Sequence, residues 1–170
     1  MSESVGTIDP PTKRVANRTG KYLIFTLGKE EYGIGILQVK EIIGMLPITS
    51  VPRTCPFVKG VINLRGKVIP VVDLRLKFSM APIPYSDRTC IIVVEPPSES
   101  GSQLTGIIVD AVSEVVAVQE EETEAAPSFG ASLDTNYILG IAKVGEGLKI
   151  LLDMERGLLA DMGAVPKDFS

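Results

Sequence analysis

The apolar residues of this chain fall in short runs, rich in valine, isoleucine and leucine, that glycine, proline and charged residues separate. Such runs predict β-strands, because β-branched side chains suit a pleated surface and turn residues end each run. Residues 37–44 fit either a short helical turn or a bent strand, whereas residues 74–78 and 154–163 predict short helical segments. Residues 79–87 and 119–136 are predicted to be polar connectors. The predicted strands cover residues 22–28, 31–36, 46–52, 60–64, 67–73, 88–96, 104–110, 112–119, 137–144 and 148–153.

Two of these runs, VIPVVDL at 68–74 and CIIVV at 90–94, are apolar almost throughout. A strand with one wet face would alternate between apolar and polar residues, so both runs predict strands buried on two faces. Between the strands at 60–64 and 67–73, the pair Arg65-Gly66 has the length of a two-residue hairpin turn.

The chain repeats its apolar pattern at a nearly constant offset. Residues 32–43 align with residues 105–116 at an offset of 73, and residues 60–73 align with residues 140–153 at an offset of 80. The first alignment places Gly33 on Gly106, and the extra residues of the second fall in the acidic connector. Apolar residues that match in the same order predict a duplicated β unit. The alternative is chance, since strands rich in valine and isoleucine resemble one another.

Each copy supplies about five short strands, and a small antiparallel sheet hides its edges by curling into a barrel. We therefore predict an all-β fold of two five-stranded barrels that share one aliphatic core, with short helices that include one near the C-terminus. Residues 1–20 and 161–170 are predicted to be tails, and residues 21–160 a single domain. The two barrels are expected to span roughly residues 21–80 and 88–153, with the chain crossing between them near both ends.

Composition narrows the class of protein. Hydrophobic residues make up 45% of the chain and aromatic residues only 5%, so the core must be aliphatic. A net charge of −4 argues against nucleic acid or an anionic membrane surface as a partner. No apolar run approaches the ~18 residues of a membrane helix, and the polar N-terminal residues lack the apolar segment of a secretory signal. We expect a cytoplasmic protein without direct membrane insertion.

The candidate chemistry is sparse. Histidine is absent, which removes the Ser-His-Asp and Cys-His systems and the usual zinc and iron sites. Cys55 and Cys90 are predicted to be reduced thiols that act as small hydrophobes. Asp73 and Asp153 each follow a strand, where an aspartate caps a short helix, and Asp110 precedes a turn with the same interpretation. We expect no catalytic residue, no cofactor and no metal.

A few residues are candidates for a protein interface. Arg65 lies in a turn whose twin has Gly145, so the hairpin does not require it. It is either a solvated turn residue or an anchor for a carboxylate or backbone group of a partner. Phe129, in a polar loop, either fills the core or projects toward a partner. Val39 and Glu41 are placed to line the seam between the copies, and Val39 also fits an ordinary core position.

The segments YLIFTLGKEEYGIGILQVKEI (22–42) and PFVKGVINLRGKVIPVVDLRLKF (56–78) closely resemble the CheW-like domain family of chemotaxis coupling, or adaptor, proteins. The block NLRG-x-x-IPVVDLR is specific to that family, and the resemblance covers about residues 20–160. It implies two barrels similar to SH3 domains around a common core, and no enzymatic activity. It also implies a scaffold that bridges the cytoplasmic tip of methyl-accepting chemotaxis receptors to the regulatory domain of the histidine kinase CheA, in signalling arrays at the inner face of the membrane.

By position, the resemblance places Val39, Glu41, Gly60 and Arg65 in a receptor-binding groove between the barrels. Family members take the helical hairpin tip of the receptor there, with apolar walls for affinity and a charge for orientation.

The resemblance also implies two contacts with the kinase. One lies around Ile48 to Val51 on the first barrel, and the other involves Phe129 on the second barrel. Together they would close rings in which the kinase domain alternates with the adaptor.

Two larger proteins, CheA and CheV, contain the same domain but need further domains for which 170 residues leave no room, so a free-standing adaptor is expected. An adaptor of a non-flagellar chemosensory pathway is the alternative that the sequence leaves open. An enzyme on a β-barrel frame is a third hypothesis, which the missing histidine and cofactor motifs argue against.

Overall fold

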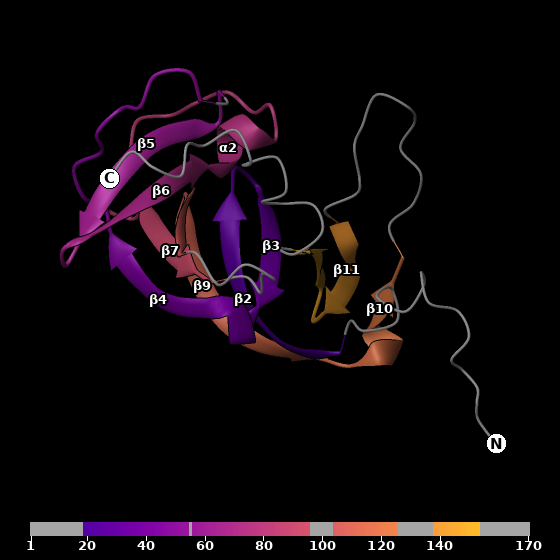
Figure 1. Cartoon of the computed structure of the whole chain (residues 1–170). Helices are drawn as coiled ribbons and strands as arrows, with labels where there is room; N and C mark the ends of the chain where they lie inside the picture. Colours follow the sequence, from indigo (N-terminus) through magenta and orange to yellow (C-terminus); the bar gives the residue numbers. More distant parts are fainter. Residues whose placement is uncertain (1–18, 55, 96–103, 126–137, 154–170) are drawn as a thin grey trace.

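The computed structural model describes residues 19–54, 56–95, 104–125 and 138–153, which form two β-sheets with only short helical turns (Figure 1). The predicted all-β class is confirmed. Sheet 1 has the strand order β10-β11-β12-β3-β2-β9, and sheet 2 has the order β4-β7-β8-β6-β5. The strands of sheet 1 are β2 (Gly20–Leu27), β3 (Glu30–Gly35), β9 (Ala111–Val118), β10 (Thr123–Glu124), β11 (Ile138–Val144) and β12 (Gly147–Leu152). Those of sheet 2 are β4 (Val39–Gly44), β5 (Val58–Leu64), β6 (Lys67–Asp73), β7 (Cys90–Val94) and β8 (Thr105–Val109).

The helical turns are η3 (Ile36–Gln38), α2 (Leu74–Lys77) and η4 (Glu120–Glu122). The segment 37–44, for which a helical turn and a bent strand were both open, contains the end of η3 followed by β4. Helix α2 begins after Asp73, whose carboxylate accepts hydrogen bonds from the backbone N–H groups of Arg75 and Leu76 at 2.9 and 3.4 Å. The predicted cap at Asp73 is thus confirmed, whereas the helix expected at 154–163 lies outside the described residues.

Two local predictions were wrong. Residues 46–52 do not form a strand, and only Thr49 pairs with Val61 in an isolated bridge. Pro47 and Pro52 lack the N–H groups that a continuous ladder needs. The acidic connector is not wholly irregular either, because its first residues form η4 and β10. There the backbone N–H of Gln119 donates to the side chain of Glu122 at 2.8 Å, which stabilises the turn before β10.

Each sheet takes strands from both halves of the sequence. The chain passes from sheet 1 to sheet 2 through η3, between β3 and β4, and returns at Asp110, between β8 and β9. Two parallel pairings join the halves: β12 with β3 in sheet 1, and β6 with β8 in sheet 2. The barrel limits given above stay a prediction, but the exchange shows that neither half builds its sheet alone.

The pairings confirm the duplication. Leu151 lies opposite Gly33 in sheet 1, and Val71 lies opposite Gly106 in sheet 2. The offsets of 73 and 80 residues convert one pair into the other. The same offsets relate the irregularity before Gly60 on β5 to the one before Gly140 on β11. Chance similarity between strands would not reproduce pairing partners and bulges together.

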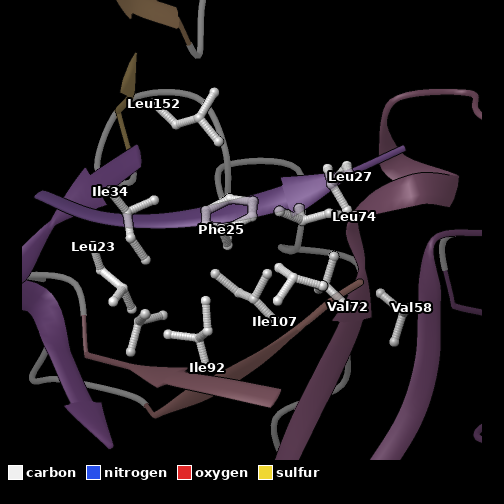
Figure 2. Close-up of a cluster of buried hydrophobic side chains, with 12 residues drawn as sticks. Leu23, Phe25, Leu27, Ile34, Val58, Val72, Leu74, Ile92, Ile107 and Leu152 are labelled. Atoms are coloured by element: carbon white, nitrogen blue, oxygen red, sulfur yellow. The ribbon is translucent and has the colours of Figure 1, made fainter. Parts of the chain in front are cut away.

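Three apolar clusters lie on the faces of the two sheets. The shared core lies between the sheets, where Figure 2 shows Phe25 and Leu152 of sheet 1 facing Ile92 and Ile107 of sheet 2. Its buried residues are Leu23, Phe25, Leu27, Ile34, Val58, Val72, Leu74, Ile92, Val94, Ile107, Val109 and Leu152. A second cluster belongs to sheet 2 (Ile62, Leu64, Ile69, Val71, Ile91, Val93 and Ile108), and a third to sheet 1 (Tyr22, Ile24, Val118, Ala142 and Leu151).

Adjacent residues of one strand enter different clusters. On β7, Ile91 and Val93 belong to the sheet 2 cluster, whereas Ile92 and Val94 belong to the shared core. On β6, Val71 and Val72 divide in the same way. The prediction that these two runs are buried on both faces is therefore confirmed, and it explains why they do not alternate.

Candidate functional site

The turn between β5 and β6 holds an arginine in a conformation that favours glycine. The φ angles of Arg65 and Gly66 are 52° and 92°, as in a type I′ hairpin turn. The side chain of Asn63 supports the turn by accepting a hydrogen bond from the Gly66 N–H at 2.8 Å. The twin turn has Gly145 at the place of Arg65, with a φ of 64°. Positive φ costs a non-glycine residue on the order of 1 kcal/mol, so folding alone would favour glycine here.

Arg65 forms an ion pair with Glu41 on β4. Strands β4 and β5 are the outer strands of sheet 2, and in a flat five-stranded sheet they would lie about 19 Å apart. The ion pair therefore requires the sheet to curl, and Figure 1 shows β4 strongly bent. The guanidinium side chain keeps 67% of its surface exposed, so it remains accessible to a partner. The twin sheet retains a glutamate, Glu114, but no arginine opposite it.

Gly60 has a structural reason to be glycine. Its φ is 146°, and a Cβ atom added there would lie 2.0 Å from the backbone oxygen of Thr49. Thr49 and Val61 exchange two backbone hydrogen bonds of 2.9 Å, which hold the segment around Ile48 against β5. Gly60 permits that close approach.

The remaining sequence-predicted residues lie in different surroundings. Val39 starts β4 opposite Val94 and packs against the shared core. Ile48 packs against the sheet 2 cluster, and the Val51 carbonyl accepts a hydrogen bond from Thr54 Oγ1 at 3.1 Å. Phe129 lies outside the described residues.

The structure thus brings the predicted residues together in two places. Glu41 and Arg65 meet at the hairpin turn. Gly60 and Ile48 meet further along β5, about 16 Å away at the rise of an extended strand. The sequence grouped Gly60 with Arg65, whereas the geometry pairs it with the segment predicted to contact the kinase.

Sequence reasoning missed a set of exposed apolar residues that the duplication repeats. Ile42 on β4 and its twin Val115 on β9 are 43% and 49% exposed, and Val68 on β6 and its twin Leu148 on β12 are 49% and 58% exposed. Leu37, beside Val39, is 95% exposed. The offsets of 73 and 80 residues were the signal that could have found the paired positions.

It also missed Tyr85, which ties the connector after α2 to β6. Its hydroxyl donates to Asp73 Oδ2 at 2.9 Å, and Lys59 Nζ lies 5.9 Å from the ring centre. Burial, followed by the hydrogen bond to Asp73 and its charge, raises the pKa of Tyr85 well above its usual range. The hydroxyl therefore stays protonated and serves as a donor.

Two searches of the described residues found no catalytic or membrane feature. No cluster of three or more Asp, Glu, Cys or His side chains in that part of the chain is arranged to hold a metal ion. None of its helices is long and apolar enough to cross a membrane.

Comparison with known proteins decides the family. Residues 21–161, which include both sheets, match the CheW-like domain. This chain belongs to the CheW-like domain family. It is 43% identical over 141 residues to the chemotaxis protein CheW of Klebsiella aerogenes, across 83% of this chain and 82% of that protein. It is 38% identical over 120 residues to the chemotaxis protein CheW of Bacillus subtilis, across 70% of this chain and 74% of that protein.

A solved structure supports the same assignment. The crystal structure of the scaffolding protein TtCheW from Thermoanaerobacter tengcongensis matches this CheW-like domain with a TM-score of 0.71 and 38% sequence identity. The match covers 80% of this chain and 90% of that one. The two-sheet fold described above is therefore that of a CheW protein, and the motif block at 63–75 forms the Arg65 turn, strand β6 and the start of α2.

Proposed function

We propose that this CheW-like domain is a non-enzymatic chemotaxis adaptor that couples the cytoplasmic tip of transmembrane chemoreceptors to the histidine kinase CheA. Membership of a family whose solved relative is described as a scaffolding protein supports a docking role. The observation that carries the proposal is Arg65, which occupies a glycine-type turn in one of two duplicated sheets. A strained and exposed residue that the twin lacks points to a role other than folding.

The receptor contact would centre on the Arg65–Glu41 pair. An arginine presents a planar fork that suits carboxylate or backbone oxygens of a helical tip, and Glu41 holds that fork in place. Val39 would support the site from the shared core. Gly60 would act indirectly, by allowing residues 48–49 to pack against β5.

The first kinase contact would use the segment around Ile48 and Val51. The segment is fixed by the Thr49–Val61 bonds but pairs with β5 only at that bridge, so it forms a firm edge beside sheet 2. The second contact would use Phe129. Because one contact lies on each copy, alternating kinase domains and adaptors would close rings at the receptor array.

The test is a sedimentation assay that contains this protein, a receptor cytoplasmic fragment and the kinase. A sedimenting ternary complex with altered kinase autophosphorylation is expected. Absence of binding to any cognate receptor and kinase would contradict the proposal. If the partners captured from cell extract belong to a non-flagellar pathway, the adaptor role stands and its pathway is corrected.

A further inference from the structure

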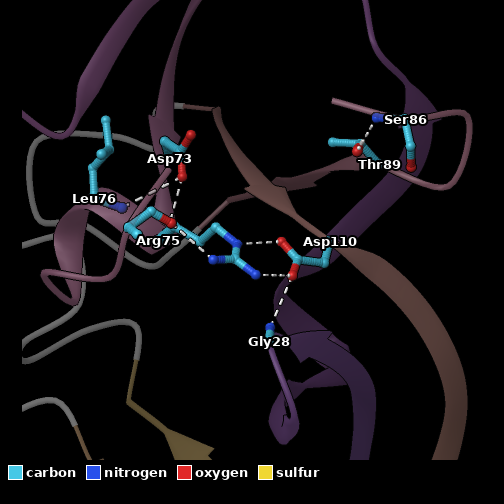
Figure 3. Close-up of polar contacts among 8 residues, drawn as sticks. Gly28, Asp73, Arg75, Leu76, Ser86, Thr89 and Asp110 are labelled. Carbon is cyan, nitrogen blue, oxygen red and sulfur yellow. Dashed lines mark hydrogen bonds and ion pairs between the residues drawn. The ribbon is translucent and has the colours of Figure 1, made fainter. Parts of the chain in front are cut away.

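Asp110 binds three parts of the chain at once. Its carboxylate accepts two hydrogen bonds from the Arg75 guanidinium, Nε to Oδ1 at 2.9 Å and Nη2 to Oδ2 at 2.7 Å. It also accepts the Gly28 N–H at 2.8 Å (Figure 3). Arg75 Nη1 donates in turn to the Ala81 carbonyl at 2.8 Å. We call the Arg75–Asp110 pair with its Gly28 contact the inter-sheet clamp.

The clamp lies where the two sheets meet. Asp110 is the residue between β8 of sheet 2 and β9 of sheet 1. Gly28 belongs to the β2–β3 turn of sheet 1, and Arg75 lies in α2, directly after β6 of sheet 2. One carboxylate therefore ties both sheets to the point at which the chain crosses between them.

The geometry of the clamp is that of a strong ion pair. The Arg75 and Asp110 side chains are only 13% and 20% exposed, and the two parallel N–H donors fix their orientation. Burial acts to raise the pKa of Asp110, but the hydrogen bonds from Arg75 and Gly28 and the charge of Arg75 outweigh it, so this pKa is lowered. The hydrogen bond to Asp110 raises the pKa of Arg75. Both groups are thus held in their charged forms.

The other crossing has no such clamp. The offset of 73 residues places Asp110 on Leu37, whose side chain is 95% exposed. A barrel crossing of this kind therefore forms without a buried carboxylate. Like Arg65, the clamp is present in only one of the two copies.

We propose that Arg75 and Asp110 are positioning residues, which fix the angle between sheet 1 and sheet 2 and thereby the relative placement of the two kinase contacts. The inference rests on the proposed function, since one contact lies on each copy. A ring closes only if each member turns the next by a constant angle. A freer angle between the sheets leaves each single contact intact but spreads the direction in which the second partner is held. Neither clamp residue needs to contact a partner.

The test compares a clamp variant with a matched control. Arg75→Met combined with Asp110→Asn removes the charges while the Asn amide oxygen still accepts the Gly28 N–H. The control, Glu31→Leu combined with Lys149→Ile, removes the partly buried ion pair that lies within sheet 1. Neither double variant changes the net charge. Spin labels on exposed cysteines at positions 21 and 67, with Cys55 and Cys90 replaced by serine, report the distance between the sheets.

The clamp variant is expected to broaden that distance distribution, to bind the kinase and the receptor fragment singly within about twofold of wild type, and to lose at least about tenfold in ring or array assembly. The control variant should match wild type in all three measurements. Arg75→Lys, which keeps the charge but not the fork, should fall between them. It also provides the test if the double variant does not fold.

Wild-type assembly by the clamp variant, or a loss of assembly with an unchanged distance distribution, would overturn the inference. A loss of single-partner binding equal to the loss of assembly would also overturn it. Failure of the wild-type protein to bind either partner would instead refute the proposed function.

Discussion

The side chain of Leu151 fills the space above Gly33 on the neighbouring parallel strand, where a Cβ atom added to the glycine would lie 3.2 Å from Leu151 Cδ2. Val71 and Gly106 repeat this relationship in sheet 2, with the corresponding distance 3.0 Å. Both pairs join strands from different halves of the chain. The two copies are therefore interlocked through strand pairs in which one residue must be small.

Replacing Gly106 by alanine should destabilise the protein by about 1–3 kcal/mol, because the new Cβ atom would lie 2.8 Å from the buried Ile91 Cγ2 and force the strands apart. Gly35→Ala is the control, since a Cβ atom there meets no atom within 4 Å. It should change stability by less than about 0.5 kcal/mol. Urea unfolding followed by circular dichroism measures both, and equal midpoints would contradict the interlocking of the copies.

Gly60→Ala should destabilise by about 2 kcal/mol or more, because its backbone is at positive φ and the Cβ atom would overlap the Thr49 carbonyl. Any loss of partner binding would then follow from displacement of residues 48–49. The free energy of unfolding and the two binding affinities separate the causes. A variant that is as stable as wild type but fails to bind the receptor would assign Gly60 a direct contact instead.

The Lys149–Glu31 pair joins strands from the two halves, and the twin positions are Ile69 and Leu104. Glu31→Leu alone should cost about 2 kcal/mol, since it leaves the lysine, whose side chain is 9% exposed, without this partner. Adding Lys149→Ile should recover most of that loss, because it restores the apolar pair of the twin. A double-mutant cycle by chemical denaturation checks this, and additive losses would contradict it.

The clamp predicts a pH dependence of stability. The pKa of Asp110 in the folded protein is lower than its ordinary value of 3.8, so its contribution is fully present above pH 3.8 and is lost as the pH falls through the folded value. Subtracting the unfolding free energy of Asp110→Asn from that of wild type should give a difference that shrinks below pH 3.8. Asp87→Asn, at an exposed connector position, is the control. A difference independent of pH would show that the charge of Asp110 does not stabilise the fold.

Much of the fold could be predicted because aliphatic runs report burial directly. The continuous runs at 68–74 and 90–94 indicated two-sided burial, and the repeated order of glycines indicated the duplication. Residues 46–52 were wrong because their apolar content resembles a strand, whereas the prolines at either end prevent a ladder. The exchange of strands between the sheets could not be predicted, since either pairing of the copies satisfies the same apolar pattern.

The candidate site was only partly visible in the sequence. Arg65 could be singled out because its twin is a glycine, but its pairing with Glu41 depends on how sheet 2 curls. Asp110 was interpreted as a turn residue, since its partners Arg75 and Gly28 are 35 and 82 residues away. Contacts at that separation follow from the topology of the strands and not from local pattern.

Arg65→Gly provides the most direct test of the adaptor role, because it replaces the arginine with the residue of the twin turn. The account predicts a protein at least as stable as wild type, since glycine accepts the positive φ and an exposed ion pair contributes less than about 1 kcal/mol. It also predicts receptor-fragment binding weaker by about 2 kcal/mol, roughly 30-fold, with unchanged kinase binding, whereas Lys67→Ala on the same hairpin should bind as wild type. Sedimentation of the ternary complex across a receptor titration measures this. Full assembly by a stable Arg65→Gly protein would contradict the central claim that this turn docks the receptor.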